Sequence, residues 1–298
     1  MHFVFFVVNI VFVSSPTPSF NGLRVLTFES RRSTEMATLI ANYGGQPISA
    51  PALREVPIES SSEAVAFVDA LTREEIDLVI LLTGVGTRAL VALVDRTRDR
   101  SAFVAALGRT RIAARGPKPV AALREIGLTP WVIAPEPNTW RELLAALDGK
   151  SSELRLQGAR VAVQEYGASN PQLLDGLAAR GAAVTRVPVY RYALPEDTQP
   201  LQQAARAVAD GQIDVALFTT SMQVVHLLEI GRQHDFEDAV RQGFQSIAVA
   251  SIGPTTSEEL REQGITIDIE ASHPKMGFLV RDAAERAGAI LRVKRGHS

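Results

Sequence analysis

Hydrophobic residues occur along the chain in short runs, separated by amphipathic segments of roughly ten residues. The run over 77–82 is almost entirely aliphatic, which is typical of a strand covered on both faces. Similar runs predict strands at 24–27, 47–53, 112–114, 131–134, 161–163, 184–190, 213–218, 247–250 and 266–269. Amphipathic segments predict helices near 34–42, 60–71, 88–94, 101–107, 120–126 and 139–147. Strands that alternate with helices indicate parallel sheets with helices on both sides, a doubly wound α/β fold.

The two halves of this pattern are copies of one unit. The run that starts at Asp77 aligns with the run that starts at Asp214, an offset of 137 residues (214 minus 77). Near the start of the chain the offset slips by one, so that Arg24 aligns with Arg160. The offset of 137 also relates Gly116 to Gly253, Pro117 to Pro254, and Pro51 to Pro188. One spacing that holds across separated blocks indicates duplication, so we expect two similar α/β lobes.

In such sheets ligands bind beyond the carboxyl ends of the strands, where the strand-to-helix loops converge. Four loops follow expected strands and precede helices: 83–87, 115–119, 219–222 and 252–256. Their backbone N–H groups would point at an anion at a helix start, where the helix dipole also favours negative charge. Two lobes with such loops therefore predict a cleft between them that is suited to a polyanionic ligand.

Polar residues at the expected helix starts fit N-capping patterns. Ser33 precedes the first helix, and Ser60 with Glu63 has the spacing of a capping box. Thr255 and Thr256 each have a glutamate at the same spacing, so we expect one of them to cap its helix.

The first twenty residues differ from the rest of the chain. Residues 3–13 are apolar except for Asn9, and the segment 14–19 (SSPTPS) breaks regular structure. This apolar run is too short to cross a bilayer, which takes about 20 residues as a helix. We expect residues 1–21 to be a weakly ordered extension, as a start codon assigned too early would give. A secretory signal is the alternative, although no Lys or Arg precedes the run.

Composition and charge narrow the function. The chain has 31 basic and 33 acidic side chains and a formal charge of −2, which argues against a nucleic-acid-binding face. It has no cysteine, which excludes disulfides, thiolate metal sites and a cysteine nucleophile. Its five histidines are scattered, so we expect no metal site.

One segment formally fits a different chemistry. Gly84, Gly86 and Ala89 match the G-x-G-x-x-A fingerprint of dinucleotide-binding proteins. However, the segment follows an internal strand, and no carboxylate stands about 20 residues further on to bind a ribose. These two departures argue against a dinucleotide site.

Several short motifs together resemble the uroporphyrinogen-III synthase family. The segment 252–256 (Ile-Gly-Pro-Thr-Thr), followed by Leu260 and Gly264, is similar to a signature of that family. The segment 218–221 (Phe-Thr-Thr-Ser) resembles its strand-end hydroxyl cluster, and 187–191 (Val-Pro-Val-Tyr-Arg) resembles its motif between the two domains. The segments 29–32 and 115–119 are similar to variants in some bacterial members. The resemblance covers roughly residues 22–292.

The resemblance implies a fold of two similar lobes joined by a two-stranded connector, with the second lobe inserted into the first. On this chain, lobe one would comprise residues 22–51 and 195–298, lobe two would comprise 52–194, and 1–21 would be an N-terminal extension. The strands that flank Pro51 and Pro188 would form the connector.

The reaction that the resemblance implies is the cyclisation of linear hydroxymethylbilane to uroporphyrinogen III, with loss of water and inversion of the last pyrrole ring. The pyrroles of the substrate supply the electron push, so the resemblance implies a lyase of haem biosynthesis that needs no cofactor and no metal. Its partner would be this small molecule, with no nucleic acid and no membrane, and it would act as a cytoplasmic monomer.

The resemblance also implies the site residues. Tyr190 matches the family tyrosine that assists the leaving hydroxyl, with an aromatic packed at the domain junction as the alternative. Thr255 and Thr256 match a pair that contacts substrate. Further substrate contacts are expected from strand-end residues, namely Thr83, Gly84, Arg115, Gly116, Lys118, Thr219, Thr220, Ser221 and Gly253. Plain helix caps are the alternative for the hydroxyls, and solvated loop charges for the two cations.

Two segments depart from the family pattern. The residues 83–86 (Thr-Gly-Val-Gly) stand where the family usually has a hydroxyl pair and Asn-Gly, and Glu165 would repel a carboxylated substrate if it faced the cleft. These departures leave a second function open, a non-catalytic module of the same fold that binds a tetrapyrrole or another polyanion for regulation. The joint presence of Tyr190, Thr255 and Thr256 favours the enzyme.

Overall fold

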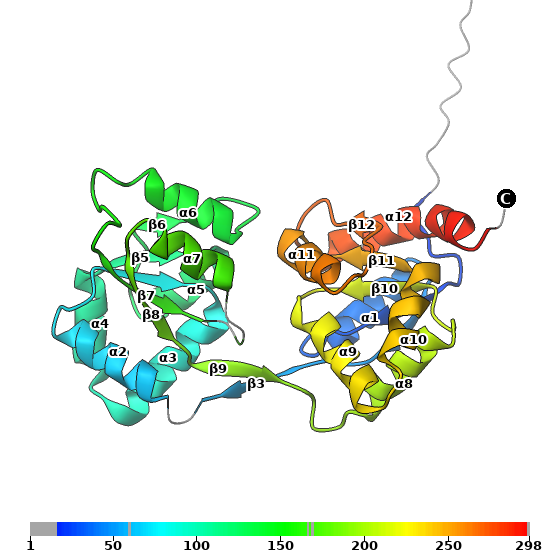
Figure 1. Cartoon of the computed structure of the whole chain (residues 1–298), viewed down its shortest axis with the longest axis horizontal. Helices are drawn as coiled ribbons and strands as arrows, with labels where there is room; N and C mark the ends of the chain where they lie inside the picture. The colour runs from blue at the N-terminus through cyan, green and yellow to red at the C-terminus, as the bar shows by residue number, and fades with distance from the viewer. Residues whose placement is uncertain (1–16, 59–60, 166, 168–169, 297–298) are drawn as a thin grey trace, which may run out of the picture.

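The chain folds into two lobes that lie side by side and are joined by a pair of antiparallel strands (Figure 1). A computed structural model describes residues 17–58, 61–165, 167 and 170–296 of the 298 in the chain. Each lobe contains a five-stranded sheet with parallel pairing throughout. The expected fold, two doubly wound α/β lobes with a two-stranded connector, is confirmed.

Lobe one draws its sheet from both ends of the chain. The strand order is β12-β11-β10-β1-β2, so that Val25 of β1 pairs with Val215 of β10. The strands are β1 (Arg24–Thr27), β2 (Gln46–Ser49), β10 (Val215–Phe218), β11 (Ala248–Ser251) and β12 (Ile269–Glu270). The helices are α1 (Ser33–Asn42), α8 (Gln199–Ala209), α9 (Met222–Gln233), α10 (Glu237–Gly243), α11 (Pro254–Glu262) and α12 (Met276–Lys294), with a 3₁₀ turn at Phe244–Ser246.

Lobe two is built from one continuous stretch of chain. Its strand order is β6-β5-β4-β7-β8. The strands are β4 (Leu78–Leu81), β5 (Arg111–Ala114), β6 (Val132–Ile133), β7 (Arg160–Gln164) and β8 (Ala183–Val187). The helices are α2 (Ser62–Thr72), α3 (Gly84–Thr97), α4 (Arg100–Arg109), α5 (Pro117–Arg124), α6 (Trp140–Asp148) and α7 (Pro171–Ala178).

The connector consists of β3 (Arg54–Pro57) and β9 (Tyr190–Ala193), which pair antiparallel. Both strands begin after the prolines that the repeat relates, Pro51 and Pro188. The strand expected at 184–190 is therefore two strands, because Pro188 has no N–H to continue a ladder. Likewise, the strand expected at 47–53 ends at Ser49.

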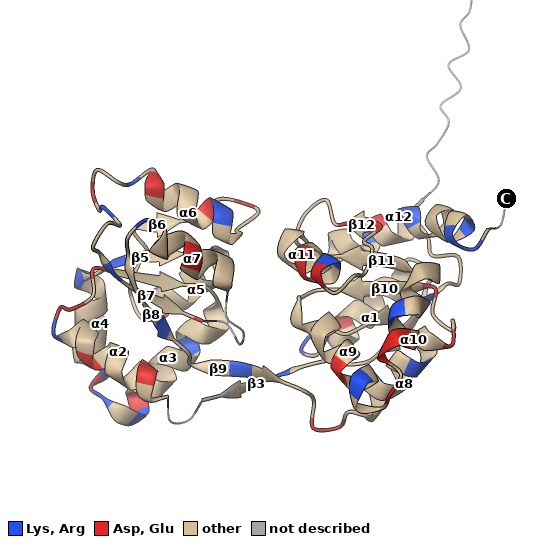
Figure 2. Cartoon of the chain, viewed as in Figure 1, with Lys and Arg blue, Asp and Glu red and all other residues tan. Residues whose placement is uncertain are grey.

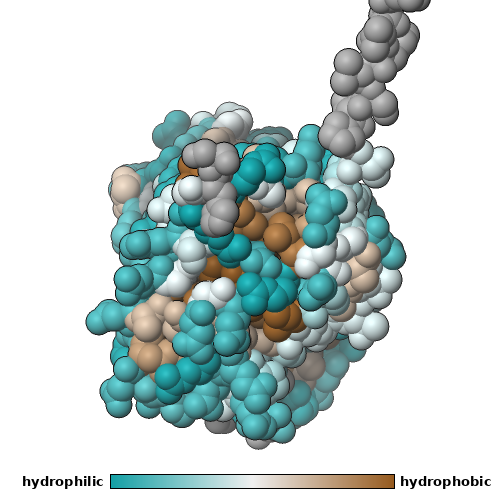
Figure 3. All heavy atoms as spheres, turned by 90° about the vertical axis from the view of Figure 1, so that its right-hand side faces the viewer, coloured by the Kyte–Doolittle hydropathy of each residue, from teal (hydrophilic) through white to brown (hydrophobic). Residues whose placement is uncertain are grey.

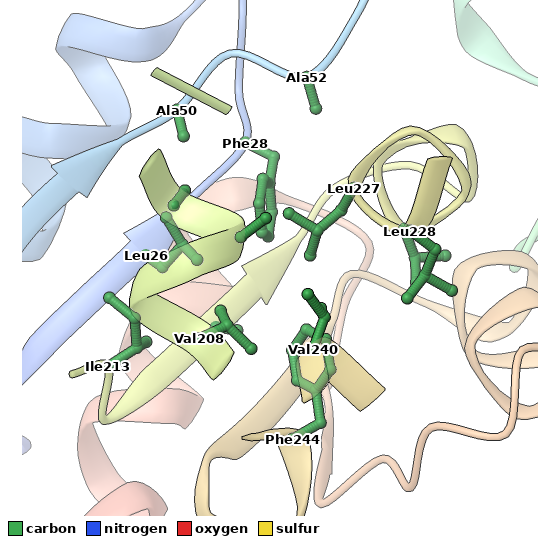
Figure 4. Close-up of a cluster of buried hydrophobic side chains, with 14 of the residues drawn as sticks. Leu26, Phe28, Ala50, Ala52, Val208, Ile213, Leu227, Leu228, Val240 and Phe244 are labelled. Atoms are coloured by element: carbon green, nitrogen blue, oxygen red, sulfur yellow. The ribbon is translucent and has the colours of Figure 1, made fainter. Parts of the chain in front are cut away.

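Each sheet has a hydrophobic core on both faces. In lobe one, α8, α9 and α10 cover one face and α1 and α12 cover the other. Figure 4 shows the first of these cores, in which the rings of Phe28 and Phe218 stack with their centroids 4.8 Å apart. In lobe two, α2, α3 and α4 cover one face and α6 and α7 the other. The strands are buried on both sides, which is why their sequences are continuous aliphatic runs.

The lobe bounds expected from the sequence stay a prediction. Two residues near these bounds pack in the core of lobe one. Phe20, in the expected extension, is buried in the core of lobe one with Met36 and Ile40. Ala52, expected at the start of lobe two, is also buried in the core of lobe one. Residues 1–16 of the expected extension lie outside the described residues.

Matching ion pairs hold corresponding strands of the two lobes and show the duplication in three dimensions. In lobe one, Asp214 accepts hydrogen bonds from the backbone N–H and guanidinium of Arg24 at 2.8–3.2 Å. In lobe two, Asp77 makes the same contacts with Arg160 at 2.7–3.0 Å. Arg295 adds a second cation at Asp214, 2.9 Å away. Burial opposes ionisation of Asp214, but these hydrogen bonds outweigh it and hold the pKa of the carboxyl below its usual value.

Two expected helix caps differ from the structure. Ser33 is the first residue of α1 and not its cap. Ser60 lies outside the described residues, and Ser61 caps α2 by accepting a hydrogen bond from the Ala64 N–H at 3.0 Å.

The surface is polar and mixed in charge. Lys and Arg are interspersed with Asp and Glu over both lobes (Figure 2). The face of lobe one in Figure 3 is mostly hydrophilic, and hydrophobic residues show only in small areas between polar ones. Among the helices of the described residues, none is long and apolar enough to cross a membrane.

Candidate functional site

The carboxyl end of β4 joins lobe two to the connector through two hydroxyls. Thr83 follows β4 and caps α3, its Oγ1 accepting a hydrogen bond from the Gly86 N–H at 3.0 Å. The same oxygen lies 3.2 Å from the hydroxyl of Tyr190. Because α3 begins at Gly84, the loop expected at 83–87 is the first turn of a helix.

Tyr190 is the first residue of β9 and is buried, with 3% of its surface exposed. Its ring packs edge-on against Tyr192, with centroids 5.6 Å apart, and belongs to the core of lobe two. Burial raises the pKa of the Tyr190 phenol above its usual value, and Tyr192 raises it further. The phenol therefore stays neutral, and its hydroxyl shares a hydrogen bond with the Thr83 hydroxyl in which either oxygen can be the donor. Its packing also agrees with the alternative of an aromatic at the domain junction.

The start of α5 brings together the other expected residues of lobe two. Gly116 occupies the N-cap position and Pro117 is the first helical residue. Arg115 is partly exposed and Lys118 is exposed. A Cβ at Gly84 would lie 2.6 Å from the carbonyl oxygen of Lys118, so glycine allows α3 and α5 to approach closely.

In lobe one, the hydroxyl cluster after β10 is organised by a glutamine. The Oε1 atom of Gln223 accepts from the N–H groups of Thr219 and Thr220, at 2.7 and 3.3 Å. Thr219 also donates its hydroxyl to Glu29 at 2.7 Å. In this structure Gln223 therefore takes the amides that were expected to face a ligand, and substrate contact through Thr219 and Thr220 stays a prediction. Ser221 stands at the N-cap position of α9 without a side-chain cap bond, so the plain-cap alternative is wrong for it.

Helix α11 follows β11 and carries the last expected residues. Gly253 is at its N-cap position, and the helix starts at Pro254, earlier than expected. Thr255 and Thr256 therefore lie inside the first turn and neither caps the helix, which corrects the expected capping box. Thr256 is buried, whereas Thr255 is partly exposed.

The two lobes turn these helix starts toward each other. In Figure 1, α5 lies on the side of lobe two that faces lobe one, and α11 lies on the facing side of lobe one. An ion pair spans the lobes, since Arg141 of α6 donates to Glu258 of α11 at 2.6 Å. The structure thus places the expected residues at the strand ends of two facing lobes, and it links Tyr190 to Thr83 directly.

Three polar residues at these strand ends were not predicted from the sequence. Gln223 and Gln164 both bind strand-end amides, the latter through the Thr83 N–H at 3.4 Å. These two glutamines carry no charge and belong to no recognised motif, so their contacts could not be predicted from the sequence. Glu29 stood in a segment noted for its resemblance, but its contact with Thr219 depends on the pairing of β1 with β10.

The charge of Glu165 is compensated within the protein. Its side chain is largely buried, and its carboxylate accepts two hydrogen bonds from Arg186 at 2.8 and 3.0 Å. From the sequence, Glu165 was expected to repel an anionic ligand if it faced the cleft. The contact with Arg186 compensates the charge of this carboxylate.

The glycines of the dinucleotide-like segment have a packing explanation. A Cβ at Gly86 would lie 1.9 Å from the side-chain nitrogen of Gln164. Glycine there lets α3 pack against the end of β7. Among the described residues, no cluster of His, Asp or Glu could hold a metal ion.

Taken together, the fold and the strand-end hydroxyls define a bilobal α/β protein whose two duplicated lobes face each other across helix starts. A family model described as uroporphyrinogen-III synthase HemD matches residues 34–281. The chain belongs to the uroporphyrinogen-III synthase family.

Individual relatives agree with this assignment. The "Uncharacterized protein YjjA" of Bacillus subtilis is 29% identical over 265 residues, which are 89% of this chain and 96% of that protein. A "Putative uroporphyrinogen-III synthase" of Methanothermobacter thermautotrophicus is 31% identical over 249 residues, 81% of this chain and 89% of that protein.

Solved structures show the same fold. A mutant uroporphyrinogen III synthase of Thermus thermophilus matches with a TM-score of 0.68 and 26% identity, over 90% of this chain and 100% of its own. The wild-type protein in a second crystal form matches with a TM-score of 0.52 and 27% identity, over 90% and 99%.

Proposed function

We propose that this protein is a uroporphyrinogen-III synthase, which cyclises hydroxymethylbilane to uroporphyrinogen III with loss of water and inversion of the last ring. Membership of the family supports this proposal. The observation that carries it for this chain is the buried Tyr190 phenol, which lies 3.2 Å from Thr83 at the junction of the connector and β4.

The hydroxyl pair gives a route for assisting the leaving group. Thr83 Oγ1 lies within hydrogen-bond distance of two groups, the Gly86 N–H and the Tyr190 hydroxyl. When the phenol donates, both lone pairs of Thr83 are used and its own proton is free to donate to a ligand. In the proposed mechanism, Thr83 contacts the departing hydroxyl and Tyr190 polarises Thr83. Departure of the hydroxyl as water, together with the N–H proton of the same pyrrole, leaves an azafulvene, which the substituted carbon of the fourth ring attacks to form the spiro intermediate.

The rest of the proposed site holds the substrate in a folded conformation. The ligand has eight carboxylates, and the facing helix starts of the two lobes offer amides, hydroxyls and a few cations. In lobe two these include Arg115 and Lys118, and in lobe one Thr255 of α11. Holding the reacting atoms in place is worth up to roughly 7–11 kcal/mol in the best cases. No resident cofactor is required by this mechanism.

The product isomer tests the proposal. Hydroxymethylbilane closes without inversion to the type I isomer in buffer, so the synthase must give the type III isomer. We expect purified protein to yield type III, measured by chromatography of the oxidised porphyrins. Type I alone would favour the non-catalytic binding module of the same fold.

A further inference from the structure

The ion pair between Arg141 and Glu258 connects the two lobes at a point remote from the connector. Arg141 is the second residue of α6 and Glu258 lies in α11, and their atoms are 2.6 Å apart. In Figure 1 these two helices lie on the opposite side of the interlobe region from β3 and β9. The connector therefore joins the lobes covalently at one edge, and this ion pair joins them at the opposite edge.

Two features indicate that this pair is not part of the fold of either lobe. The repeat offset of 137 relates Arg141 to Phe278 and Glu258 to Ala121, so the positions equivalent to this pair carry no charges. By contrast, the ion pair of Asp214 with Arg24 has a counterpart in lobe two, the ion pair of Asp77 with Arg160. The second feature is that a cation in the first turn of α6 is unfavourable with the helix dipole, so Arg141 does not stabilise the helix that contains it.

The arginine is oriented for this contact by its neighbour. Its guanidinium lies over the ring of Trp140, 4.4 Å from the centroid. Such stacking restricts the long side chain and reduces the entropy lost when the ion pair forms. Both partners remain accessible to solvent, at 53% and 32% of the side-chain surface, so the contact can open.

We infer that Arg141 and Glu258 are positioning residues, which hold the two lobes at the spacing where both sets of strand ends contact one ligand. This inference rests on the proposed function, because it concerns the substrate of that reaction. An exposed ion pair shifts an equilibrium by about fivefold or less. The pair therefore biases the lobes toward the spacing in this structure and still allows them to separate for substrate to enter.

The lobe spacing can be measured without any activity. The chain has no cysteine, so spin labels at Ser152→Cys and Glu285→Cys, one exposed site in each lobe, report one distance by pulsed electron paramagnetic resonance. We expect Glu258→Gln to lengthen or broaden this distance, and the charge reversal Arg141→Glu with Glu258→Arg to restore it. Molar salt should move the wild-type distance the same way, because the Debye length is then about 3 Å.

A matched control is available on the same helix. Asp148 at the end of α6 pairs with Arg180 at 2.7 Å, but both residues belong to lobe two. Asp148→Asn removes an ion pair of similar exposure and should leave the distance unchanged. A distance that is the same in Glu258→Gln and wild type, or one that Asp148→Asn changes equally, would overturn the inference.

Kinetics separate this inference from the proposed function. With hydroxymethylbilane, Glu258→Gln should raise KM by up to about fivefold with kcat within about twofold of wild type. The charge reversal should return KM toward its original value. If wild type makes no type III isomer but the distances respond as expected, the pair sets the lobe spacing and only the proposed function fails. An unchanged KM in an active enzyme would refute the positioning role.

Discussion

Replacing Tyr190 with phenylalanine removes one buried hydroxyl and leaves the ring in place. The structure gives the expected cost to stability. The hydrogen bond of 3.2 Å to Thr83 is lost together with the polar contact of the phenol with Tyr192, whereas Thr83 keeps its bond to the Gly86 N–H. A neutral hydrogen bond contributes about 0.5–1.5 kcal/mol, so we expect the free energy of unfolding to fall by about 1 kcal/mol. Chemical denaturation with an unchanged slope against denaturant would show that the fold is intact.

The effect on catalysis should be larger than the effect on folding. A general acid in direct contact contributes roughly 10²–10⁴-fold, and Tyr190 acts through Thr83, so we expect kcat to fall by about ten- to a hundredfold. The matched control is Tyr43→Phe, which removes a phenol hydroxyl in lobe one, at the C-cap of α1. Initial rates of type III formation for the two variants decide the question. A kcat equal to wild type in Tyr190→Phe, or an equal loss in Tyr43→Phe, would refute the mechanism.

The pKa of Tyr190 makes a related prediction. Burial holds this pKa above the usual value of about 10, so the phenol stays protonated over the whole range in which the enzyme is assayed. We expect the pH dependence of kcat below pH 10 to be the same in wild type and Tyr190→Phe. An alkaline decline that the substitution abolishes would show that the phenol ionises and contradict the neutral-donor role.

Further predictions concern stability, measured by chemical denaturation. Asp214→Asn should cost about 2–3 kcal/mol, because this carboxylate is buried between two arginines, whereas the more exposed Asp77→Asn should cost about 1 kcal/mol; the reverse order would contradict the argument. The lowered pKa of Asp214 stabilises the fold above the unfolded pKa of about 4, and this contribution is lost as pH falls through the folded value. Acid should therefore destabilise wild type more steeply than Asp214→Asn, and parallel curves would exclude this linkage. Gly86→Ala should destabilise by about 1–3 kcal/mol, because its Cβ would displace the amide of Gln164, which is buried and accepts a hydrogen bond from the Thr83 N–H. Gly288→Ala, where a Cβ meets nothing within 4 Å, should be neutral or stabilise by up to about 1 kcal/mol, and equal losses would rule out the clash.

The fold was predictable from the sequence because the strands are buried on both faces. The run beginning at Asp77 and its copy beginning at Asp214 became β4 and β10, at the centre of equivalent sheets. Helix starts were predicted less well. The segment after Thr83 has two glycines, which suggested a loop, but close packing against Gln164 and α5 stabilises it as helix. Local preference was overridden there by a contact that only the folded chain contains.

The candidate site was predictable in its positions and not in its contacts. Strand ends and hydroxyls identify Thr83 and Thr219 from the sequence, because parallel sheets place their carboxyl ends at one edge. The hydrogen-bond partners of these residues could not be predicted in the same way. Tyr190 meets Thr83 across 107 residues, and Gln223 takes the amides that we expected a ligand to use. These pairings depend on side-chain geometry, for which residue type and spacing carry no signal.

The split origin of the first sheet has a consequence for synthesis of the protein. Its strand β1 leaves the ribosome long before the central strand β10, since 190 residues separate the paired Val25 and Val215. At about 5–20 residues per second, that interval lasts about 10–40 seconds. Throughout it, the edge of β1 that β10 will occupy has no partner, and by the end of the interval the inserted lobe has all five of its strands. The nascent chain therefore completes its interior domain first and has an unpaired strand edge in lobe one until β10 has been made.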